Sequence, residues 1–416
     1  MELKRVVVTG LGALTPLGNT VPEYWNALLA GTSGANLITR FDASKFKTKF
    51  ACELKGFNIE DHLERKEARK MDPYTHYAMV VVKEAIQDAG LDLEKINRDR
   101  VGVIWGSGIG GLYTFQEECF NFAKGDGTPR FNPFFIPKMI ADIASGYISI
   151  QYGFRGPNYT TVSACASSNN AIIDACTYIR LGKADVFVTG GSEAAITEAG
   201  VGGFNALKAL SENNENFATA SRPFDQTRDG FVLGEGGGCL ILESYEHAVA
   251  RGAKIYAEVI GGGMSADAYH ITAPHPEGLG ALNVMRAALS DANIDPTEID
   301  YINVHGTSTP LGDIQEAKAI QGVFGEHAYN LNISSTKSMT GHLLGAAGAI
   351  EAIATILAVK NDIIPPTINF VNADPELDPK LNFTFNKAQQ RTVRIGMSNT
   401  FGFGGHNTSA IFRKME

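Results

Sequence analysis

The chain has 416 residues, of which 44% are hydrophobic and 19% are charged. This length is enough for about two to three domains, and the composition supports a large buried core and excludes an intrinsically disordered protein. The formal net charge of −9 also speaks against non-specific nucleic-acid binding, which requires a basic surface, although a local basic patch could still bind an acidic protein.

The cysteines and the apolar segments indicate the compartment. The five cysteines are scattered and show no C-x-x-C spacing, which favours a reducing environment. The first residues lead directly into a predicted strand at Val6, so we expect no signal peptide. Because we find no run of about 18 apolar residues, we also expect no membrane-spanning segment and a cytoplasmic location.

Short apolar runs alternate with amphipathic segments along the chain. The spacing of apolar residues predicts helices over 74–89, ending at Gly90, and over 279–292. Buried strands are predicted over 6–9, 101–105, 186–189, 238–242, 255–261 and 301–304. Alternating strands and helices indicate an α/β protein with covered sheets.

The chain shows no low-complexity tract and no linker rich in Pro, Gly or Ser, which indicates one compact body. The segment 251–254 is the best candidate for a seam, and we predict two halves, 1–253 and 254–416. No internal repeat is visible in the sequence, so any duplication would have to be structural.

Cys165 lies at a predicted junction between a strand and a helix. β-prone residues from Tyr159 onward lead into small residues, and the helix that follows has Ala171, Ile172, Ala175 and Ile179 on one stripe. The amide N–H groups and the dipole at such a helix start favour a thiolate and can stabilise an oxyanion. Cys165 is therefore a candidate nucleophile, with a buried structural cysteine as the alternative. We assign a structural role to the other four cysteines, Cys52, Cys119, Cys176 and Cys239.

Two histidines lie in loops rich in glycine and hydroxyl residues. His305 follows a predicted strand and opens the loop His-Gly-Thr-Ser-Thr-Pro-Leu-Gly-Asp, and His342 precedes a helix of small residues. A neutral imidazole can donate or accept a hydrogen bond, so one ring can orient a group while the other polarises a carbonyl. A single histidine would favour a structural role, but two of them together with Cys165 indicate a catalytic set.

Charged residues accompany these histidines. Lys337, five residues before His342, could bias protonation states at the site, or it could be an ordinary solvated lysine. Asp313 and Glu316 could pair with Lys337 or order the loops. Because the Cys and His spacings fit neither H-x₃₋₅-H nor C-x-x-C, we predict no zinc site.

A glycine-rich segment over 106–111 follows a predicted strand and matches G-x-G-x-x-G. The next residues, through Phe115, Cys119 and Gly125, do not predict a helix followed by a strand that ends in an acidic residue. We therefore favour a close backbone turn that lines a pocket, with Ile109 in its wall, over a dinucleotide site.

Four motifs occur in order along the chain. They are the segment around Cys165, the loop 305–313, the segment 337–342, and Ser-Asn-Thr-Phe-Gly-Phe-Gly-Gly over 398–405. Together they resemble the β-ketoacyl-carrier-protein synthase family, and the resemblance extends over nearly the whole chain.

Within this family the chain most resembles the type II elongating synthases of dissociated fatty-acid synthesis. Ile109 and three further segments carry that resemblance, namely 202–211, 220–225 and 228–235. The resemblance implies a thiolase-like fold of five layers, α-β-α-β-α, built from two similar halves. It also implies a homodimer.

The reaction implied by the resemblance is a decarboxylative condensation. Cys165 would take an acyl chain from an acyl carrier protein as a thioester. Malonyl-carrier protein would then lose carbon dioxide while His305 and His342 polarise its thioester carbonyl, and the resulting carbanion would attack the acyl thioester to give a 3-oxoacyl product. Because departing carbon dioxide supplies the carbanion, the site needs an activated thiolate and oxyanion stabilisation rather than a strong base. No cofactor or metal is implied beyond the phosphopantetheine arm that carries the substrates.

The resemblance assigns further roles. The backbone N–H groups of Cys165 and Phe403 would form an oxyanion hole, and Phe403 in its glycine frame would be a movable gate. Lys337 would belong to the catalytic set. The substrate-binding residues would be Thr307 and Thr309 at the phosphopantetheine arm, Ile109 and Phe204 in the acyl pocket, and Thr272. Ordinary core packing is the alternative for Ile109 and Phe204.

The carrier protein of this family is acidic, so a basic island is expected where it docks. The predicted docking patch consists of Arg65, Lys66, Arg69 and Lys70, with Lys208 as an addition. A solvated helix face is the alternative.

Other proteins with this fold remain alternatives. A non-catalytic partner subunit resembling a chain-length factor would lack the active cysteine. A thiolase would need a second catalytic cysteine in the C-terminal half, whereas every cysteine here lies at or before Cys239. Initiating synthases and chalcone-type enzymes use Cys/His/Asn, which His342 disfavours. A polyketide or other secondary-metabolite ketosynthase would share every catalytic residue and is the closest alternative.

Overall fold

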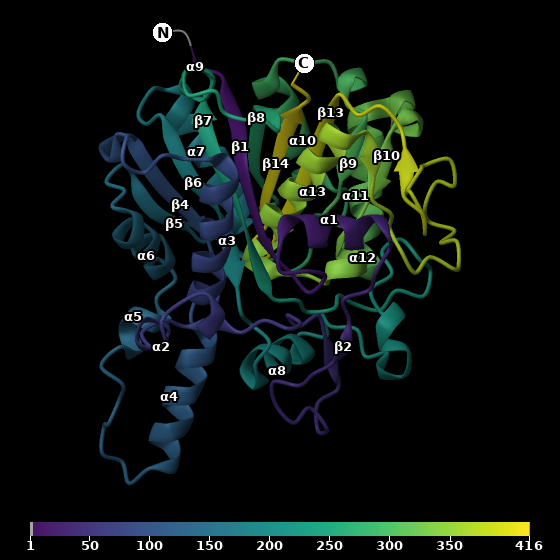
Figure 1. Ribbon diagram of the computed structural model, residues 1–416. Coiled ribbons are helices and arrows are strands. Elements are labelled where there is room, and N and C mark those ends of the chain that lie inside the picture. The colour runs from purple at the N-terminus through teal and green to yellow at the C-terminus, as the bar shows by residue number, and fades with distance from the viewer. Residues whose placement is uncertain (1–2, 416) are drawn as a thin grey trace.

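The computed structural model describes residues 3–415, and within them ten strands form one mixed sheet (Figure 1). These strands are β1 (Val6–Leu14), β4 (Val101–Gly106), β5 (Asn158–Thr161), β6 (Val186–Glu193), β7 (Gly236–Ser244), β8 (Ala257–Ala266), β9 (Tyr301–Asn303), β10 (Asn332–Ser334), β13 (Ile395–Gly402) and β14 (His406–Arg413). Their order across the sheet is β10-β9-β13-β14-β8-β1-β7-β6-β4-β5.

The sheet consists of two five-strand halves that share one pattern of strand directions. In the first half β5, β4 and β6 are parallel, and β7 and β1 follow in antiparallel order. In the second half β10, β9 and β13 are parallel, and β14 and β8 follow in antiparallel order. The duplication that is invisible in the sequence is therefore present in the topology. The two sets of strands are compatible with halves at 1–253 and 254–416, a division that remains our proposal.

Helices form three further layers around these strands. The central layer is α7 (Ser167–Arg180) and α13 (Ala347–Asn361), which contact strands of both halves and each other. One outer layer, α3 (Pro73–Ala89) and α6 (Ile143–Tyr152), covers the first half, and α10 (Leu279–Ala292) covers the second with α11 (Pro310–Phe324) packed beside it. This is the α-β-α-β-α arrangement that the resemblance predicted.

The central helix α13 is apolar on all sides. With the residues just before it, it forms an 18-residue segment, Leu344–Asn361, whose length and mean hydropathy of 1.3 would allow it to cross a membrane. Within this protein, however, 89% of that segment is buried. A helix enclosed between the two halves of the sheet needs no polar face, so it can be as apolar as a membrane span. This segment is not an uninterrupted apolar run, because it contains Glu351 and Lys360.

The predicted elements agree with the observed ones where periodicity is strong. The predicted helix 279–292 coincides with α10, and α3 starts one residue before the predicted 74–89, at Pro73, where the Asp72 side chain accepts a hydrogen bond from the Tyr74 N–H. The strands β13 and β14 were not predicted as elements. They are rich in small and polar residues, which are buried here because hydrogen bonds and the central helices cover them.

Shorter elements complete the chain. The helices are α1 (Val21–Leu29), α2 (Arg65–Ala68), α4 (Leu112–Lys124), α5 (Phe135–Met139), α8 (Glu198–Ala206), α9 (Tyr245–Ala250) and α12 (Lys337–Thr340). The short strands are β2 (Asn36–Leu37), β3 (Phe50–Ala51), β11 (Ile363–Ile364) and β12 (Gln389–Gln390). Single turns of 3-10 helix include η3 (Ala164–Ala166) and η7 (Leu344–Ala346). In Figure 1, α4 and the loop after it extend away from the body of the protein.

The glycine turn over 106–111 does not lead into a dinucleotide fold. Helix α4 follows it, but the next strand, β5, begins only at Asn158 and contains no acidic residue. The turn instead lies beside a cavity, as predicted.

Candidate active site

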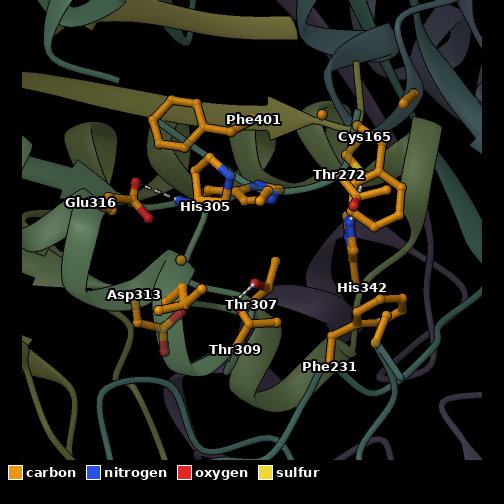
Figure 2. A pocket seen from close by; sticks show the side chains of 18 of the residues that line it. Cys165, Phe231, Thr272, His305, Thr307, Thr309, Asp313, Glu316, His342 and Phe401 are labelled. Atoms are coloured by element: carbon orange, nitrogen blue, oxygen red, sulfur yellow. Dashed lines mark hydrogen bonds between the residues drawn. The ribbon is translucent and has the colours of Figure 1, made fainter. Parts of the chain in front are cut away.

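A cavity of about 730 Å³ is lined by residues from both halves of the chain. Cys165 and His342 lie side by side in it, and His305 lies nearby with Glu316 beside its backbone (Figure 2). The two ends of the Cys165–His342 contact are 177 residues apart in the sequence. Tertiary packing thus brings together the three residues that the motifs singled out.

Cys165 is positioned by a tight turn between β5 and α7. The turn places Ala164 in the left-handed region, with φ of 50°, and Cys165 lies within η3 immediately before α7. The Ser167 hydroxyl stabilises the turn, since it donates to the Ala164 carbonyl at 2.6 Å and accepts from the Ser163 N–H at 2.9 Å. The thiol therefore lies at the start of a helix, as the sequence predicted.

The thiol of Cys165 is buried, with only 8% of the residue exposed. Burial raises the pKa of this thiol to about 12, while the nearby charge of Lys337 and the Phe403 backbone N–H act in the opposite direction. Burial therefore opposes the thiolate that the helix start was expected to favour. The Nε2 atom of His342 lies 2.9 Å from the Cys165 Sγ and can take up its proton.

His342 follows α12 and is held on several sides. Its backbone N–H donates to the Val232 carbonyl at 2.7 Å, and its ring makes edge contacts with Phe231 and His305, at centroid distances of 5.3 and 5.4 Å. Burial, with a contribution from the charge of Lys337, holds the pKa of His342 well below 6.5. The ring is therefore neutral and able to accept a proton.

His305 follows β9 and is positioned through its backbone. The carboxylate of Glu316, on α11, accepts from the N–H groups of His305 and Gly306 at 2.9 and 2.8 Å. The ring lies against Phe401, with centroids 5.5 Å apart. Burial, then the charge of Lys337 and the neighbouring His342, holds the pKa of His305 well below 6.5, so this ring is neutral too.

Lys337 is buried rather than solvated, with 1% of the residue exposed. It forms an ion pair with Glu351 of α13. The prediction that Asp313 or Glu316 pairs with Lys337 is therefore wrong. Glu351 was missed, although a lone carboxylate in the middle of an apolar helical run is a signal for a buried ion pair.

Asp313 orders the loop that carries the two threonines. It accepts from the N–H groups of Phe224 and Ser308 at 2.9 and 3.2 Å, and its carboxylate lies 3.5 Å from the guanidinium of Arg228. Burial raises the pKa of Asp313 to about 6, although Arg228 and these backbone donors lower it. The alternative prediction for Asp313, that it orders the loops, agrees with these contacts.

Phe403 lies in the turn between β13 and β14. Gly404 and Gly405, with φ of 88° and 74°, follow it, so the turn uses backbone conformations that favour glycine. This turn is joined to a second loop, because the Gly404 N–H donates to the Ile271 carbonyl at 2.7 Å and the Asp267 N–H donates to the Gly405 carbonyl at 2.9 Å. The two loops thus cover one side of the cavity together.

The other predicted substrate-binding residues also line the cavity, as does one member of the docking patch. They are Ile109, Phe204, Thr272, Thr307, Thr309 and, from the patch, Lys208. Thr307 and Thr309 hydrogen bond to each other through their hydroxyls at 3.0 Å (Figure 2). The cavity is also lined by four apolar residues that the sequence did not single out, namely Leu207, Phe231, Leu344 and Phe401. The first two and Phe401 lie in segments that carry the resemblance, but an apolar side chain in such a segment does not reveal whether it faces a cavity or the core.

The rest of the docking patch lies outside the cavity, on and just after α2. Arg65, Lys66 and Arg69 are exposed. Arg65 pairs with Glu60 at 3.3 Å and Lys70 with Glu67 at 2.7 Å, whereas Lys66 and Arg69 form no salt bridge within residues 3–415.

Metal and disulfide chemistry find no support in the described part of the chain. Among residues 3–415, no group of three or more His, Cys, Asp or Glu side chains is placed to hold a metal ion. All five cysteines are free. Four of them, Cys52, Cys165, Cys176 and Cys239, are buried.

Comparison with known proteins identifies this cavity. The model for the N-terminal domain of β-ketoacyl synthases matches residues 3–248, and the model for their C-terminal domain matches residues 256–371. The chain belongs to the β-ketoacyl synthase family. It is 51% identical over 413 residues to 3-oxoacyl-[acyl-carrier-protein] synthase 2 of Staphylococcus aureus (strain COL), and the match covers 99% of both chains.

Solved structures of similar proteins share the fold of this β-ketoacyl synthase. The ishigamide ketosynthase/chain length factor matches with a TM-score of 0.93 and 35% identity, over 100% of both chains. A type II polyketide ketosynthase bound to the hexaketide, in complex with its acyl-carrier protein, matches with a TM-score of 0.90 and 34% identity, again over 100% of both chains.

As a β-ketoacyl synthase, this protein is an acyltransferase of fatty-acid elongation. It condenses a malonyl unit with an acyl chain, with loss of carbon dioxide, and forms a 3-oxoacyl product. This confirms the fold class and the reaction that the motifs predicted.

Proposed function

We propose that Cys165 carries the acyl chain and that His342 and His305 serve its transfer and the decarboxylation of malonyl-carrier protein. The observation that supports this most directly is the 2.9 Å contact between Cys165 Sγ and His342 Nε2, with a second neutral imidazole in the same cavity. Nucleophile and base lie within hydrogen-bonding distance, which is the geometry that nucleophilic catalysis requires.

In the first half-reaction the Cys165 sulfur attacks the thioester carbonyl of an acyl-carrier protein. Its proton passes to His342 Nε2, which lies 2.9 Å from the sulfur. Burial raises the pKa of the thiol and lowers that of the imidazole, so it is the direct contact between the two groups that supports this transfer. The C–S bond to the phosphopantetheine sulfur breaks, and that sulfur leaves with the proton as a thiol. The oxyanion of the tetrahedral intermediate would accept hydrogen bonds from the backbone N–H groups of Cys165 and Phe403.

In the second half-reaction malonyl-carrier protein loses carbon dioxide. The electron pair of the broken C–C bond moves toward the thioester oxygen, where the imidazoles of His305 and His342 stabilise the enolate. The enolate carbon then attacks the acyl carbonyl, the Cys165 sulfur leaves, and one proton from solvent restores the thiol. Lys337 would act at a distance, since its charge lowers the pKa of both rings and keeps them neutral.

The acyl chain and its phosphopantetheine arm would occupy opposite parts of the cavity. Ile109 and Phe204 are proposed as walls of the acyl pocket, while Thr307, Thr309 and Thr272 would contact the arm. Asp313 and Glu316 would support the loop between His305 and Thr309 through the backbone hydrogen bonds described above. Phe403, in its glycine-rich turn, would be the gate between the two parts.

The proposed partner is an acidic acyl carrier protein. Lys66 and Arg69 are exposed cations without an ion pair within residues 3–415, and Lys208 lies at the lining of the cavity. Arg65 and Lys70 complete the docking patch. Unpaired basic side chains attract an acidic partner at long range and raise its rate of association. The related ketosynthase in complex with its acyl-carrier protein supports a partner of this kind.

The second proposed partner is another copy of this chain. Strand β5 forms one edge of the ten-stranded sheet, and Val162 directly after it is 60% exposed. The projecting segment around α4 and α5 exposes a group of aromatic side chains, Phe115, Phe120, Phe122, Phe131 and Phe134. An exposed strand edge beside a large apolar patch is the kind of surface that a homodimer buries. We place this enzyme in the cytoplasm, where five free cysteines stay reduced.

Two alternatives remain, and each has a discriminating observation. A polyketide ketosynthase would use the same catalytic residues, but the type II polyketide ketosynthase structure is 34% identical to this chain, against 51% for the 3-oxoacyl-[acyl-carrier-protein] synthase 2. A chain-length-factor-like partner subunit would lack an acylated cysteine, so the state of Cys165 decides that case.

Intact mass measurement tests the proposal. The purified protein and its Cys165→Ala variant are mixed with medium- and long-chain acyl-carrier proteins. We expect a mass gain equal to the acyl group on the first protein only, and malonyl-carrier protein should discharge it as a 3-oxoacyl product. Absence of any adduct on folded protein would overturn the nucleophile assignment and favour the partner-subunit alternative. An adduct that only polyketide intermediates form would favour the polyketide alternative.

A further inference from the structure

A buried carboxylate that the reaction does not use lies behind the cavity. Glu193, the last residue of β6, is completely buried, and it forms no salt bridge within residues 3–415. Five neutral donors satisfy it instead: the Ser107 hydroxyl and the backbone N–H groups of Gly108, Ile109, Gly110 and Gly345. A buried charge held only by backbone and hydroxyl donors is costly unless its position is closely defined.

Both carboxylate oxygens bind the glycine turn, and one of them also binds a second loop. Oε1 accepts from Ser107 Oγ at 3.2 Å, from Ile109 N at 3.2 Å and from Gly110 N at 3.3 Å, all in the glycine turn. Oε2 accepts from Gly108 N at 2.7 Å and from Gly345 N at 3.0 Å, and Gly345 lies in η7, three residues after His342. Glu193 therefore bridges the turn that carries Ile109 to the segment that follows the catalytic histidine.

Both loops contribute to the cavity, and the carboxylate leaves no space between them. Ile109, from one loop, and Leu344, from the other, line the cavity together with Cys165. A Cβ atom on Gly345 would lie 2.6 Å from Glu193 Oε2 and 2.2 Å from the Gly108 N, so neither loop can move toward the other. Ile109 is 40% exposed, so neighbouring side chains fix its position only partly. The position of its side chain therefore depends on the backbone of the glycine turn.

We propose that Glu193 is a positioning residue that holds the Ile109 wall of the acyl pocket against Cys165 and so sets the preference for long over short acyl chains. This inference rests on the proposed role of the cavity as the acyl pocket. The reacting carbonyl lies at Cys165 for every acyl group, but the tail of a long chain must extend past the Ile109 wall, whereas the tail of a short chain ends before it. A displaced wall would therefore slow acylation by long chains and leave the reactivity of the thiol unchanged.

The isosteric substitution Glu193→Gln isolates this role. A glutamine has one acceptor oxygen, and its NH₂ group would face at least two of the N–H donors that now bind the carboxylate. One of the two loops must then separate from residue 193. The shape and volume of the side chain stay the same, so a cavity or an overpacked core does not complicate the result.

The experiment measures acylation of Cys165 by octanoyl- and hexadecanoyl-carrier protein, by intact mass over time, in the full-length enzyme. For Glu193→Gln we expect the ratio of long-chain to short-chain rates to fall about tenfold, the size of effect that loss of hydrogen bonds to a buried charge can produce. Alkylation of Cys165 by iodoacetamide, which needs no acyl pocket, should stay within about twofold of the original enzyme.

Two further variants make the outcome specific. Ser107→Ala removes one donor to Oε1 and keeps the carboxylate, so it should shift the same ratio in the same direction by a smaller factor, and it provides the test if Glu193→Gln does not fold. Glu316→Gln, the matched change at the carboxylate behind His305, should slow malonyl decarboxylation and leave the chain-length ratio unchanged.

The outcomes separate this inference from the proposed function. If the original enzyme accepts no acyl group on Cys165, the proposed function fails. If it does, and folded Glu193→Gln or Ser107→Ala keeps the original ratio of chain-length rates, the positioning role of Glu193 is wrong. An equal loss for both chain lengths and for iodoacetamide would also overturn it, because such a result means general disruption of the site.

Discussion

Lys337 and Glu351 form an ion pair inside the protein, between α12 and α13, with both side chains almost completely buried. Burial lowers the pKa of His305 and His342, and the pair lies close enough to the cavity for the lysine charge to lower it further. The pair thus satisfies two charges in the core, and the lysine adds to the effect of burial that keeps both rings neutral.

Removal of one partner should destabilise the fold. In Glu351→Ala the Lys337 ammonium stays buried without its counter-charge, and we expect the free energy of unfolding to fall by roughly 3 kcal/mol. Urea denaturation followed by circular dichroism measures this change. The double variant Lys337→Met, Glu351→Leu, which leaves no unpaired charge, should lose less stability than Glu351→Ala, and a larger loss would contradict the role of the pair.

The lysine charge should also set the pH range of acyl transfer. His342 must be neutral to accept the thiol proton, and its pKa lies well below 6.5 because of burial and then the charge of Lys337. Acyl transfer should therefore persist as the pH falls below 6.5. Without the lysine charge the pKa of His342 rises, so in the Lys337→Met, Glu351→Gln variant the activity should be lost at a higher pH than in the original enzyme.

This profile is measured as the initial rate of Cys165 acylation between about pH 5 and 8. We expect the acylation rate of the variant to fall at a higher pH than that of the original enzyme. If the rate falls at the same pH or at a lower pH, the charge of Lys337 does not act on His342. Iodoacetamide alkylation across the same range provides a control for the thiol itself.

The two histidines should differ in the half-reaction they serve. His342 touches Cys165 at 2.9 Å, whereas His305 makes no hydrogen bond to the thiol and faces His342 across the cavity. In His305→Ala we expect malonyl decarboxylation to slow about a hundredfold while acylation of Cys165 continues at nearly the original rate. In His342→Ala both half-reactions should slow.

Release of labelled carbon dioxide from malonyl-carrier protein and the mass gain on Cys165 measure the two half-reactions separately. Equal effects of the two substitutions on acylation would show that the contact between Cys165 and His342 does not determine proton transfer.

Charge reversal should test the docking patch. In the triple variant Lys66→Glu, Arg69→Glu, Lys70→Glu we expect KM for acyl-carrier protein to rise about tenfold, and less at high salt because ions screen exposed charges. The KM for a small acyl-pantetheine should stay unchanged. Lys95→Glu, a reversal of an exposed charge beyond the opposite end of α3, is the control. An unchanged KM for the carrier-bound substrate would show that the carrier protein docks elsewhere.

Local patterns were sufficient for much of this protein. The period of apolar residues predicted α10 at its observed bounds, because the buried positions of an amphipathic helix recur every three to four residues in the sequence. Cys165, His305, Lys337 and His342 were found because each lies in a short motif of small or turn-forming residues. The resemblance carried by these motifs, rather than any spacing, predicted the reaction.

Other features depend on contacts between distant segments. The partner of Lys337 was predicted among Asp313 and Glu316, which are near in sequence to the histidine loop. It is Glu351 instead, because α13 packs against both halves of the sheet in the interior of the protein. The thiolate expected from a helix start is opposed by burial, and burial depends on which loops cover Cys165. Glu193 could not be singled out at all, since its five donors come from two loops that meet only in the folded chain.

The sequence by itself therefore determined the family, the order of the strands and helices with strong periodicity, and the side chains that we propose as the reacting ones. Only the tertiary structure decided which carboxylate neutralises Lys337, how deeply Cys165 is buried, and which loops Glu193 joins. The physical reason is the distance along the chain over which each effect acts. Helix periodicity and turn formation depend on residues a few positions apart, whereas desolvation and ion pairing depend on every segment that packs around a group.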